Sequence, residues 1–356
     1  MESIKKIHNF SAGPSILSTY AIEQSIADLQ NFSGTGLSAI EVSHRGKEFQ
    51  KVMDDACDLV KTLLNIPDTH DILFLQGGAS TQFFQIPMNF LSGKAVYLNT
   101  GIWSKKAITE AKAYGEVIEC ASSAHSNFNY IPTGYDIDSS ADYFHCTSNN
   151  TIFGTQMQGF PYSSVPLICD MSSDIFSRPV DVSKFDLIYA GAQKNMGPAG
   201  VTLVIINKEL YNKTAHRHIP TMLKYDTHAE AGSMYNTPPV FAILASMHNL
   251  KWLKDLGGVE AIQKINEEKA NILYSAIDES PYFIGTAEVN SRSKMNVCFV
   301  FKEEHQALEE KFNNLCKEAG ISGIKGHRSV GGYRASIYNA MPTESVQVLA
   351  DIIKGL

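Results

Sequence analysis

Lys194 is the residue of this chain with the clearest capacity for chemistry. It lies in residues 190–198, AGAQKNMGP, with one apolar run before it at 187–190 and another after it at 201–206. Its small neighbours would let a bulky group reach the amine, and removal from water would lower the amine pKa and make it a nucleophile toward carbonyls. A surface lysine in a glycine-rich hairpin explains this segment, taken alone, equally well.

A carboxylate at the end of an earlier strand favours the chemical interpretation. The apolar run at 165–169 predicts a buried strand, which Asp170 closes. Ligands of open α/β sheets bind beyond the carboxyl ends of the strands, and the interval to Lys194, 194 − 170 = 24 residues, leaves room for a loop, a short element and one more strand. The pair suits pyridoxal phosphate. The lysine can form a Schiff base with its aldehyde, while the carboxylate pairs with the pyridinium nitrogen and keeps the ring an electron sink.

Six segments of the chain resemble segments of the phosphoserine aminotransferases, which are class-V aminotransferases that have fold-type I and bind pyridoxal phosphate. Two of them, residues 169–174 and 189–195, contain Asp170 and Lys194. The resemblance runs from residue 9 to residue 342, and its most specific parts are the block around Lys194 and the last segment. The other four segments are residues 9–14, 43–47, 235–239 and 327–340.

The resemblance implies an α/β fold of two domains. A large domain, residues 16–258, would bind the cofactor on a mostly parallel seven-stranded sheet, and residues 1–15 and 259–356 would form a smaller α+β domain. The implied reaction is amino transfer between L-glutamate and 3-phosphohydroxypyruvate, giving O-phospho-L-serine and 2-oxoglutarate in serine biosynthesis. Bacterial relatives suggest 4-phosphohydroxy-L-threonine of pyridoxine biosynthesis as a second substrate. The family also implies a cytoplasmic homodimer with shared active sites.

Alternating apolar runs indicate the elements that must position these residues. Runs at 72–75 and 95–98 predict strands, and residues 81–91 and 105–114 after them predict helices. Strands that alternate with helices argue for a mostly parallel sheet covered on both faces.

The C-terminal part shows longer helical patterns. Residues 240–256 predict a helix that ends at a pair of glycines, and residues 259–277 predict a charged helix that leads into the smaller domain. That domain would contain a strand at 295–301 and a helix at 304–319 that ends at Gly320.

Composition and charge exclude several classes of function. The 356 residues suffice for one large and one small domain, and a net charge of −7 argues against nucleic-acid binding. No apolar run approaches the length of a membrane span, and residues 1–6 lack the apolar stretch of a signal peptide. The six cysteines form no CxxC pair, which predicts free thiols in a reducing cytosol.

The loop at residues 76–81, QGGAST, is the predicted anion site. It follows a strand and opens a helix, where glycines allow close approach and free N–H groups favour negative charge. It is neither a GxGxxG nor a Walker loop, and a glycine-rich turn with an N-cap is the plain alternative. The resemblance assigns Ala79 and Ser80 to the cofactor phosphate. Many relatives carry arginine at the Ser80 position, which leaves this site less cationic here.

The remaining cofactor residues are implied by the resemblance. Trp103 would stack on the pyridine ring, although an indole there also fits a place in the core. Thr151 resembles the threonine that hydrogen-bonds the ring hydroxyl. Gln193 resembles a phosphate ligand, as do Asn236 and Thr237 from a neighbouring subunit.

Two His-Arg pairs and a later arginine predict the substrate site. The planar guanidinium matches carboxylate and phosphate, although surface charge explains any one arginine alone. The resemblance assigns Arg334 to the substrate α-carboxylate. It assigns His44 and Arg45 of the neighbouring subunit, with His327 and Arg328, to the substrate phosphate. The side-chain carboxylate of glutamate would use the same cationic cluster.

The sequence also bears on four other functions: a metal site, a different class-V aminotransferase, a desulfurase and a phosphate-binding module. Residues 216–218, His-Arg-His, are interpreted as surface, so no metal site is predicted. A different class-V aminotransferase would share the lysine and the aspartate. A desulfurase needs a cysteine on a mobile loop, whereas Cys298 lies in a predicted strand and Cys316 in a predicted helix. A non-catalytic phosphate-binding module would not need the cofactor residues that this chain retains.

Overall fold

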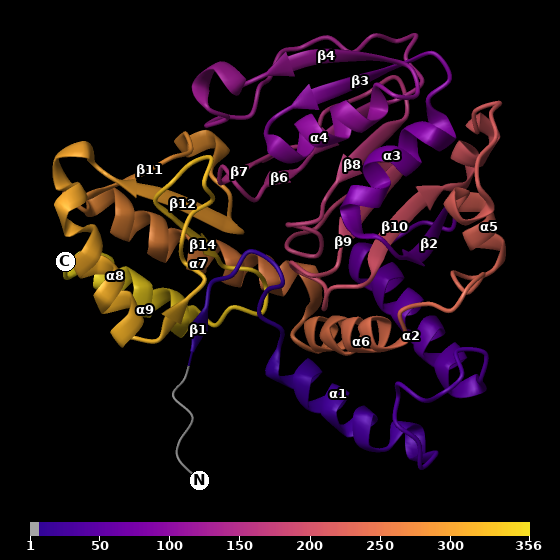
Figure 1. Cartoon of the computed structure of the whole chain (residues 1–356), viewed down its shortest axis with the longest axis horizontal. Helices are drawn as coiled ribbons and strands as arrows, with labels where there is room; N and C mark the ends of the chain where they lie inside the picture. The colour runs from indigo at the N-terminus through magenta and orange to yellow at the C-terminus, as the bar shows by residue number, and fades with distance from the viewer. Residues whose placement is uncertain (1–6) are drawn as a thin grey trace.

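A seven-stranded sheet forms the centre of the protein, whose computed structural model describes residues 7–356 (Figure 1). The strand order is β2-β10-β9-β8-β5-β3-β4, and neighbours pair in parallel except for β10, which is antiparallel to β2 and β9. This confirms the mostly parallel sheet. The strands are β2 (His70–Leu75), β3 (Lys94–Asn99), β4 (Glu116–Ser122), β5 (Phe144–Thr147), β8 (Leu167–Asp170), β9 (Leu187–Gly191) and β10 (Thr202–Asn207).

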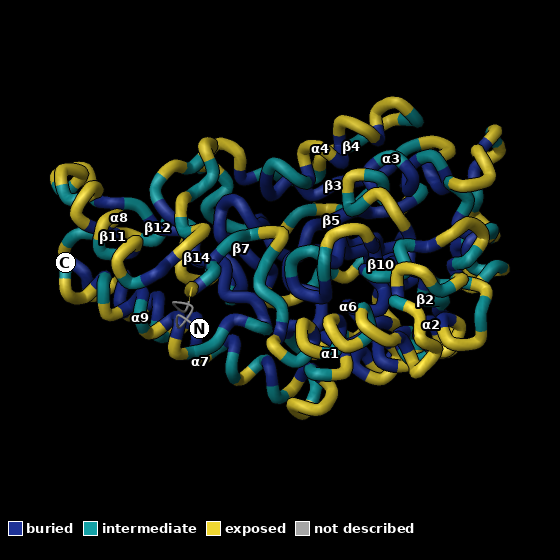
Figure 2. Tube along the Cα trace, turned by 60° about the horizontal axis from the view of Figure 1, so that its bottom comes forward, coloured by how far each residue is buried: buried dark blue, intermediate teal, exposed yellow. Residues whose placement is uncertain are grey.

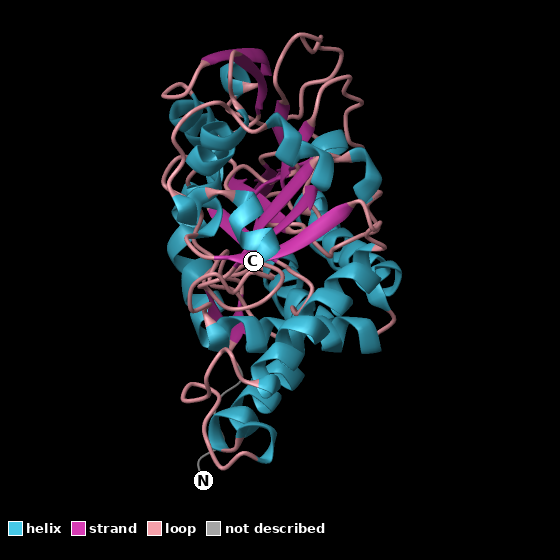
Figure 3. Ribbon diagram, turned by 90° about the vertical axis from the view of Figure 1, so that its right-hand side faces the viewer, coloured by secondary structure: helices cyan, strands magenta, loops and turns pink. Residues whose placement is uncertain are grey.

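Helices cover both faces of this sheet, so that its strands lie between layers of helix (Figure 3). Alternate strand residues enter two cores: Ile168 packs in the core shared with α3 and α4, and its neighbour Cys169 in the core shared with α2 and α6. Every residue of β5, β8 and β9 is buried, as expected for parallel strands covered on both faces. The helices here are α1 (Thr19–Gln30), α2 (Lys47–Leu64), α3 (Gly78–Phe90), α4 (Ile102–Ala111), α5 (Tyr225–Glu230) and α6 (Val240–Asp255).

A smaller α+β unit is built from the two ends of the chain. Its antiparallel sheet has the order β11-β12-β14, and β1 pairs in parallel with β13. Phe10 packs into the same core as Phe299 and Phe312, which places the N-terminal segment in this unit. Its elements are β1 (His8–Asn9), α7 (Gly258–Glu279), β11 (Phe283–Gly285), β12 (Asn296–Phe301), α8 (Glu309–Glu318), β13 (Ile321–Ser322), β14 (Tyr333–Ser336) and α9 (Thr343–Lys354).

Buried segments run through the interior of both units, while the exposed chain lies on their outer helices and loops (Figure 2). The two cores support the predicted division at residues 16–258 and 259–356, whose boundaries stay a proposal. Residues 1–6, predicted to join the small domain and to hold no signal peptide, lie outside the described residues. None of the described helices combines the length and apolar character needed to cross a membrane.

Three predicted helices differ from those observed. The helix predicted at 81–91 begins at Gly78, and that predicted at 105–114 begins at Ile102. In the second case the Ser104 hydroxyl accepts the backbone N–H of Gly101 at 2.9 Å, a cap that the apolar pattern does not reveal. The helix predicted at 304–319 is divided, because its first part is a 3₁₀ helix, as is common at helix N-termini. Short 3₁₀ helices occur at Phe32–Gly34, Ala124–Ser126, Val182–Lys184, Lys208–Lys213, Thr221–Leu223, Val289–Ser291 and Glu303–Leu308.

The surface interpretation of residues 216–218 is wrong for Arg217. Its guanidinium is half-buried, donates to the backbone carbonyls of Leu91 and Tyr114, and lies 5.5 Å from the Tyr114 ring centroid. His216 and His218 are exposed, as predicted. Arg217 therefore joins the segment before α5 to the segments that follow α3 and α4.

Gly197, which ends the turn after Lys194, packs directly against α6. A Cβ at this position would lie 2.9 Å from the Cα of Ser246, a helix backbone atom that cannot move cheaply. We expect Gly197→Ala to destabilise the protein by about 1–3 kcal/mol through overpacking. The thermal unfolding midpoint measures the effect.

Gly159→Ala is the matched control, because nothing lies within 4 Å of its Cβ position. Its effect should stay within about 0.5 kcal/mol, as for ordinary surface substitutions. Equal unfolding midpoints for the two variants would show that the close packing of Gly197 against α6 does not contribute to stability.

Candidate active site

A cavity of about 460 Å³ lies beyond the carboxyl ends of β8 and β9, between the large sheet and the smaller unit. Its volume suits a cofactor with a small substrate. Nine of the predicted site residues, from both units, line it. They are Ala79, Ser80, Trp103, Thr151, Asp170, Gln193, Lys194, His327 and Arg334.

Lys194 projects into the cavity from the turn between β9 and β10. Its Nζ donates to the Thr151 hydroxyl at 2.8 Å and lies 5.4 Å from the Trp103 ring centroid. Burial lowers the pKa of this amine to about 8; Asp170 opposes that effect, and the charge of Arg334 adds to it. The amine is therefore neutral more often than an ordinary lysine amine.

Backbone contacts fix the turn that carries Lys194. The N–H of Ser15 donates to the Gln193 carbonyl at 3.0 Å, and its hydroxyl donates to the Lys194 carbonyl. On the other side, the side-chain amide of Asn195 donates to the Ile175 carbonyl at 2.6 Å. The lysine thus extends from a braced loop into the cavity.

Asp170 closes β8 at the floor of the cavity and is almost fully buried. Burial raises the pKa of its carboxyl group, while nearby Lys194 and hydrogen bonds from Ser172 counter the rise. The backbone N–H of Ser172 donates to Oδ1 at 2.9 Å, and the Ser172 hydroxyl accepts from Gly191 N–H at 3.2 Å. A buried carboxylate held in this way matches a cationic ring nitrogen.

The first turn of α3 forms the end of the cavity suited to an anion. Gly77 and Gly78 have φ values of +96° and +69°, which favour glycine and open the backbone N–H groups at the helix start. The Thr81 hydroxyl donates to the Gly77 carbonyl at 3.0 Å, so it serves the turn, whereas the exposed Ser80 remains available. Nothing lies within 4 Å of a Cβ on Gly78, which leaves space for a phosphate.

These groups fit pyridoxal phosphate. The cavity offers an anion-binding helix start, a buried carboxylate and an amine of lowered pKa, which match the phosphate, ring nitrogen and aldehyde of that molecule. Trp103 adds an aromatic face beside Lys194. Thr151, held in the turn between β6 (Asn149–Asn150) and β7 (Thr155–Gln156), would be freed to bind the ring hydroxyl once Lys194 engages the aldehyde.

Arg334 and His327 line the cavity from the smaller unit, and Arg334 brings positive charge to it. Arg334 lies on β14; its Nη1 approaches the Thr151 carbonyl at 3.5 Å, and its Nε has no partner among the described residues. Burial and the charges of Arg334, Arg328 and Lys106 lower the pKa of His327. This side of the cavity therefore attracts anions through arginine and lysine, while His327 contributes a neutral hydrogen-bonding ring.

Sequence reasoning missed Lys106, Ser172 and Phe83. Lys106 Nζ lies 4.6 Å from the Trp103 ring centroid, one helical turn further along α4. Its spacing of three residues from Trp103 was a usable signal, because side chains so spaced share a helix face. Ser172 and Phe83 line the cavity but carried no such signal.

Four predicted residues stand apart from the cavity of their own chain. His44 and the exposed Arg45 lie in the loop between α1 and α2, and α1 reaches away from the large sheet (Figure 1). Asn236 and Thr237 are exposed and lie before α6. Their assignment to a neighbouring subunit's site stays a prediction.

A fifth residue, Arg328, was predicted to face the substrate within one chain. It is exposed and does not line the cavity, although its charge reaches the adjacent His327. Its assignment to the substrate phosphate also stays a prediction.

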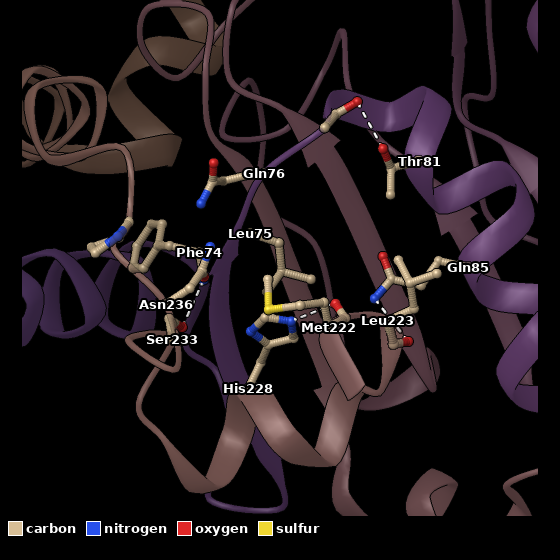
Figure 4. A pocket seen from close by; sticks show the side chains of 12 residues that line it. Phe74, Leu75, Gln76, Thr81, Gln85, Met222, Leu223, His228, Ser233 and Asn236 are labelled. Atoms are coloured by element: carbon tan, nitrogen blue, oxygen red, sulfur yellow. Dashed lines mark hydrogen bonds between the residues drawn. The ribbon is translucent and has the colours of Figure 1, made fainter. Parts of the chain in front are cut away.

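A second cavity, of about 230 Å³, lies next to the anion-binding turn (Figure 4). Asn236 lines it, and the Thr237 carbonyl accepts a hydrogen bond from Gln76 Nε2 at 3.1 Å. His228 in its wall donates from Nε2 to the Met222 carbonyl oxygen at 2.9 Å. Asn236 and Thr237 of the same chain thus lie beside loop 76–81, at a cavity that Lys194 does not line.

A buried polar seam fixes the two units relative to each other. Asn149 Nδ2 donates to Asn296 Oδ1 at 2.8 Å, which joins β6 to β12. The Asn339 N–H donates to Asn195 Oδ1 at 2.9 Å, so the segment after Arg334 is tied to the residue after Lys194.

The chain matches known proteins over nearly its whole length. Residues 7–349 match the family model for aminotransferase class-V. The chain is 55% identical to a phosphoserine aminotransferase of Bacteroides fragilis, covering 98% of each chain, and 56% identical to that of Flavobacterium johnsoniae, covering 99% of each. The structure of phosphoserine aminotransferase from Bacillus circulans subsp. alkalophilus is similar with a TM-score of 0.95 at 46% identity, covering 98% of each. These comparisons confirm the resemblance noted in the six segments.

The lowered pKa of Lys194 predicts how the protein without cofactor captures pyridoxal phosphate. Only the neutral amine attacks the aldehyde, so the rate should rise with pH through a midpoint near the Lys194 pKa of about 8. At pH 7 about a tenth of the amine is then neutral, far more than for an ordinary lysine of pKa about 10.4. Stopped-flow absorbance of cofactor binding across a pH series measures the midpoint.

Two variants should move that midpoint in opposite directions. Asp170→Asn removes a charge that raises the Lys194 pKa and should lower the midpoint, whereas Arg334→Gln removes a charge that lowers it and should raise the midpoint. A midpoint near 10 in the unaltered protein, or shifts of the same sign in both variants, would contradict these electrostatics.

Proposed function

Because the chain belongs to the class-V aminotransferase family, we propose that it transfers the amino group of L-glutamate to 3-phosphohydroxypyruvate, giving O-phospho-L-serine and 2-oxoglutarate. It is an aminotransferase that uses pyridoxal phosphate. The observation that carries the proposal is the meeting of Lys194, Asp170 and Arg334 at one cavity. The chain is also more than half identical to proteins named phosphoserine aminotransferase.

Lys194 and Asp170 divide the proton chemistry. Bound pyridoxal phosphate supplies an electron sink for the charge left on the substrate Cα when its proton departs. Lys194 would hold the cofactor through its amine, and its Nζ would take the proton from the substrate Cα. Its pKa of about 8 suits this step, because an acid–base group works best near the operating pH. Asp170 would keep a proton on the ring nitrogen of that molecule.

Other residues hold the cofactor in place. Ala79, Ser80 and Gln193 would bind its phosphate, together with Asn236 and Thr237 of a second copy of the chain. Trp103 would stack on the ring, and Thr151 would bind the ring hydroxyl. The anion-binding start of α3 supports this orientation.

Cationic groups select the substrates. Arg334, whose Nε is free of protein partners among the described residues, would bind the α-carboxylate that both substrates share. His327 and Arg328, with His44 and Arg45 of the second copy, would bind the phosphate or the side-chain carboxylate of glutamate. Charge mimicry thus lets one site serve both half-reactions.

The setting of the reaction follows from the same proposal. Formation of O-phospho-L-serine belongs to serine biosynthesis, and the keto acid related to 4-phosphohydroxy-L-threonine is a second substrate to assay. All six cysteines are free thiols, which supports a cytoplasmic location. None of them lines the main cavity, so a desulfurase reaction lacks its nucleophile.

A transamination assay with glutamate and a panel of keto acids tests the activity. Phosphorylated three-carbon keto acid should react far better than its unphosphorylated counterpart. Arg334→Ala should lower kcat/KM for both half-reactions roughly tenfold to a hundredfold, because both substrates lose a charged hydrogen-bond partner. Arg328→Ala should impair the phosphorylated substrate at least as much as glutamate.

The two half-reactions are measured separately by cofactor absorbance in single turnovers. An Arg334 variant impaired with one substrate only would remove that arginine from the α-carboxylate. No activity with any phosphorylated keto acid would refute the proposed function.

We further propose a homodimer in which each active site draws on both chains. Mixing Lys194→Ala with Arg45→Ala under subunit exchange should then restore activity, since one site of each mixed dimer carries no lesion. Random pairing makes about half the dimers mixed, so roughly a quarter of the unaltered activity should return.

Mixing Lys194→Ala with Asp170→Asn is the control, because these residues line one cavity in one chain. Every site in such a mixed dimer keeps a lesion, so no activity should return. If the Arg45 mixture also stays inactive although mass spectrometry finds mixed dimers, Arg45 does not serve the partner's site.

A further inference from the structure

Three buried asparagine side chains meet where the two units join, and two of them are close in the sequence to residues of the active site. Asn195 directly follows Lys194, and Asn339 lies on the segment after β14, the strand that carries Arg334. Asn266 lies on α7. The three are 6%, 4% and 1% exposed, in that order. Buried amides need hydrogen-bond partners, and those partners show what this asparagine cluster holds together.

Each side-chain amide of the asparagine cluster donates to a backbone carbonyl of one turn, residues 175–177. The three bonds are Asn195 Nδ2 to Ile175 at 2.6 Å, Asn339 Nδ2 to Phe176 at 2.9 Å and Asn266 Nδ2 to Ser177 at 3.1 Å. The turn is joined to the end of β8, because the Ile175 N–H donates to the Met171 carbonyl at 2.9 Å. Phe176 has a φ of +61°, a left-handed conformation that a bulky residue keeps only where its surroundings hold it. The cluster therefore contributes to holding this turn.

Asn339 links the other two members of the cluster. Its backbone N–H donates to Asn195 Oδ1 at 2.9 Å, and its Oδ1 accepts from Asn266 Nδ2 at 2.8 Å. With its own Nδ2 bonded to the turn, Asn339 uses both polar atoms of its side chain and its backbone N–H. It is therefore the member of the cluster whose replacement should loosen all of its contacts.

The three segments held in this way carry the three side chains of the proposed chemistry. Asp170 precedes the turn 175–177, Lys194 precedes one member of the cluster, and Arg334 precedes another. Because these three side chains come from separate segments, their relative positions depend on contacts between those segments. The asparagine cluster supplies such contacts, and its hydrogen bonds join all three segments to one another.

A buried lysine on α7 holds the segment that contains Asn339. Lys269 lies one helical turn after Asn266 and is 0% exposed. Its Nζ donates to the Tyr338 carbonyl at 2.7 Å and to the Met341 carbonyl at 3.2 Å, on either side of Asn339. Burial lowers the pKa of this amine to about 7, and no carboxylate among the described residues pairs with it. A buried amine without a counter-ion is unfavourable unless its hydrogen bonds stay intact, so Lys269 opposes movement of this segment.

We propose that Asn339 is a positioning residue, which through the asparagine cluster holds Lys194 where proton transfer from the substrate Cα requires it. Asn339 does not line the cavity, so it acts through Asn195 and the turn 175–177. The inference rests on the proposed function, because it assumes that Lys194 takes that proton. A cluster that only stabilised the fold would change how much of the protein is folded, but not the rate constant of this step.

The test is the half-reaction with glutamate in single turnovers, followed by cofactor absorbance, with either hydrogen or deuterium on the glutamate Cα. Asn339→Leu keeps the approximate size of the side chain and removes both of its hydrogen bonds. The rate constant should fall roughly tenfold to a hundredfold, as for a reacting group displaced by about 1 Å. Because proton transfer then becomes slower relative to the other steps, the deuterium effect on the rate constant should be at least as large as in the unaltered protein.

A measurement without cofactor locates the displacement. Hydrogen exchange of the protein, read by mass spectrometry of its peptides, should become roughly tenfold faster in Asn339→Leu for residues 171–177 and 195–197, as for loss of a buried hydrogen bond. Peptides from β2 and β3 should exchange as in the unaltered protein. Unchanged exchange in both affected segments would overturn the proposal.

Asn89→Leu is the matched control. Asn89 is also buried, and its Nδ2 donates to the carbonyls of Gln85 and Leu223, each at 2.8 Å. It lies on α3 and does not line the main cavity. Its replacement should lower the thermal unfolding midpoint and leave the rate constant and the deuterium effect unchanged. Equal losses of rate constant in the Asn89 and Asn339 variants would overturn the proposal.

A double variant tests whether the cluster acts as a unit. Asn266→Leu removes the donor to Asn339 Oδ1 and should lower the rate constant in the same direction. The double variant Asn266→Leu with Asn339→Leu should lose less than the product of the two single losses, because residues that act through one contact are not additive. Losses that simply multiply would contradict a shared role.

Lys269→Met keeps the proposal testable if Asn339→Leu does not fold. It removes the amine that donates to the Tyr338 and Met341 carbonyls and keeps an unbranched apolar side chain. Unchanged rate constants in both Lys269→Met and Asn266→Leu would then overturn the proposal. If the unaltered protein shows no reaction with glutamate, the proposed function fails instead; a normal reaction with unchanged rate constants in the variants refutes the positioning role alone.

Discussion

The structure depends on holding a buried amine and a buried carboxylate together at one cavity. Burial lowers the pKa of Lys194 and raises that of Asp170, and each charge partly offsets the effect on the other. The balance leaves a lysine that is neutral often enough to attack a carbonyl and an aspartate that requires a cationic partner. A lysine in bulk water or an aspartate without its hydrogen bonds would have neither property.

The scaffold keeps this pair at a fixed geometry. Asp170 ends a fully buried strand, and Lys194 extends from a turn braced by Ser15 and Asn195. Asn195 also accepts a hydrogen bond from the Asn339 N–H, which connects the segment after Arg334 to the turn that carries Lys194. Buried polar contacts between the two units, in addition to apolar packing, therefore hold Arg334 of the smaller unit at the cavity.

Positive charge is distributed unevenly around the cavity. The start of α3 offers backbone N–H groups with Ser80 beside them, while Arg334, Arg328 and Lys106 act on the side near His327. Burial and the combined charge of these cations lower the pKa of His327, and the same positive charge would stabilise an anionic group of a substrate there. Loop 76–81 has no cationic side chain. It can still bind a phosphate, because the N-terminus of a helix itself favours anions.

Local patterns in the sequence were sufficient to predict the mostly parallel sheet and to place Asp170 at the end of a strand and Lys194 between two strands. Short stretches of chain contain these signals, because each strand has its own apolar run and its own last residue. The beginnings of α3 and α4 were misplaced, since Gly77 and Gly101 start helices without an apolar signal. Tertiary structure alone decided that His145 and Tyr189 meet and that Arg217 is half-buried. Those contacts join segments far apart in the chain, where sheet register and packing, not local periodicity, determine which side chains become neighbours.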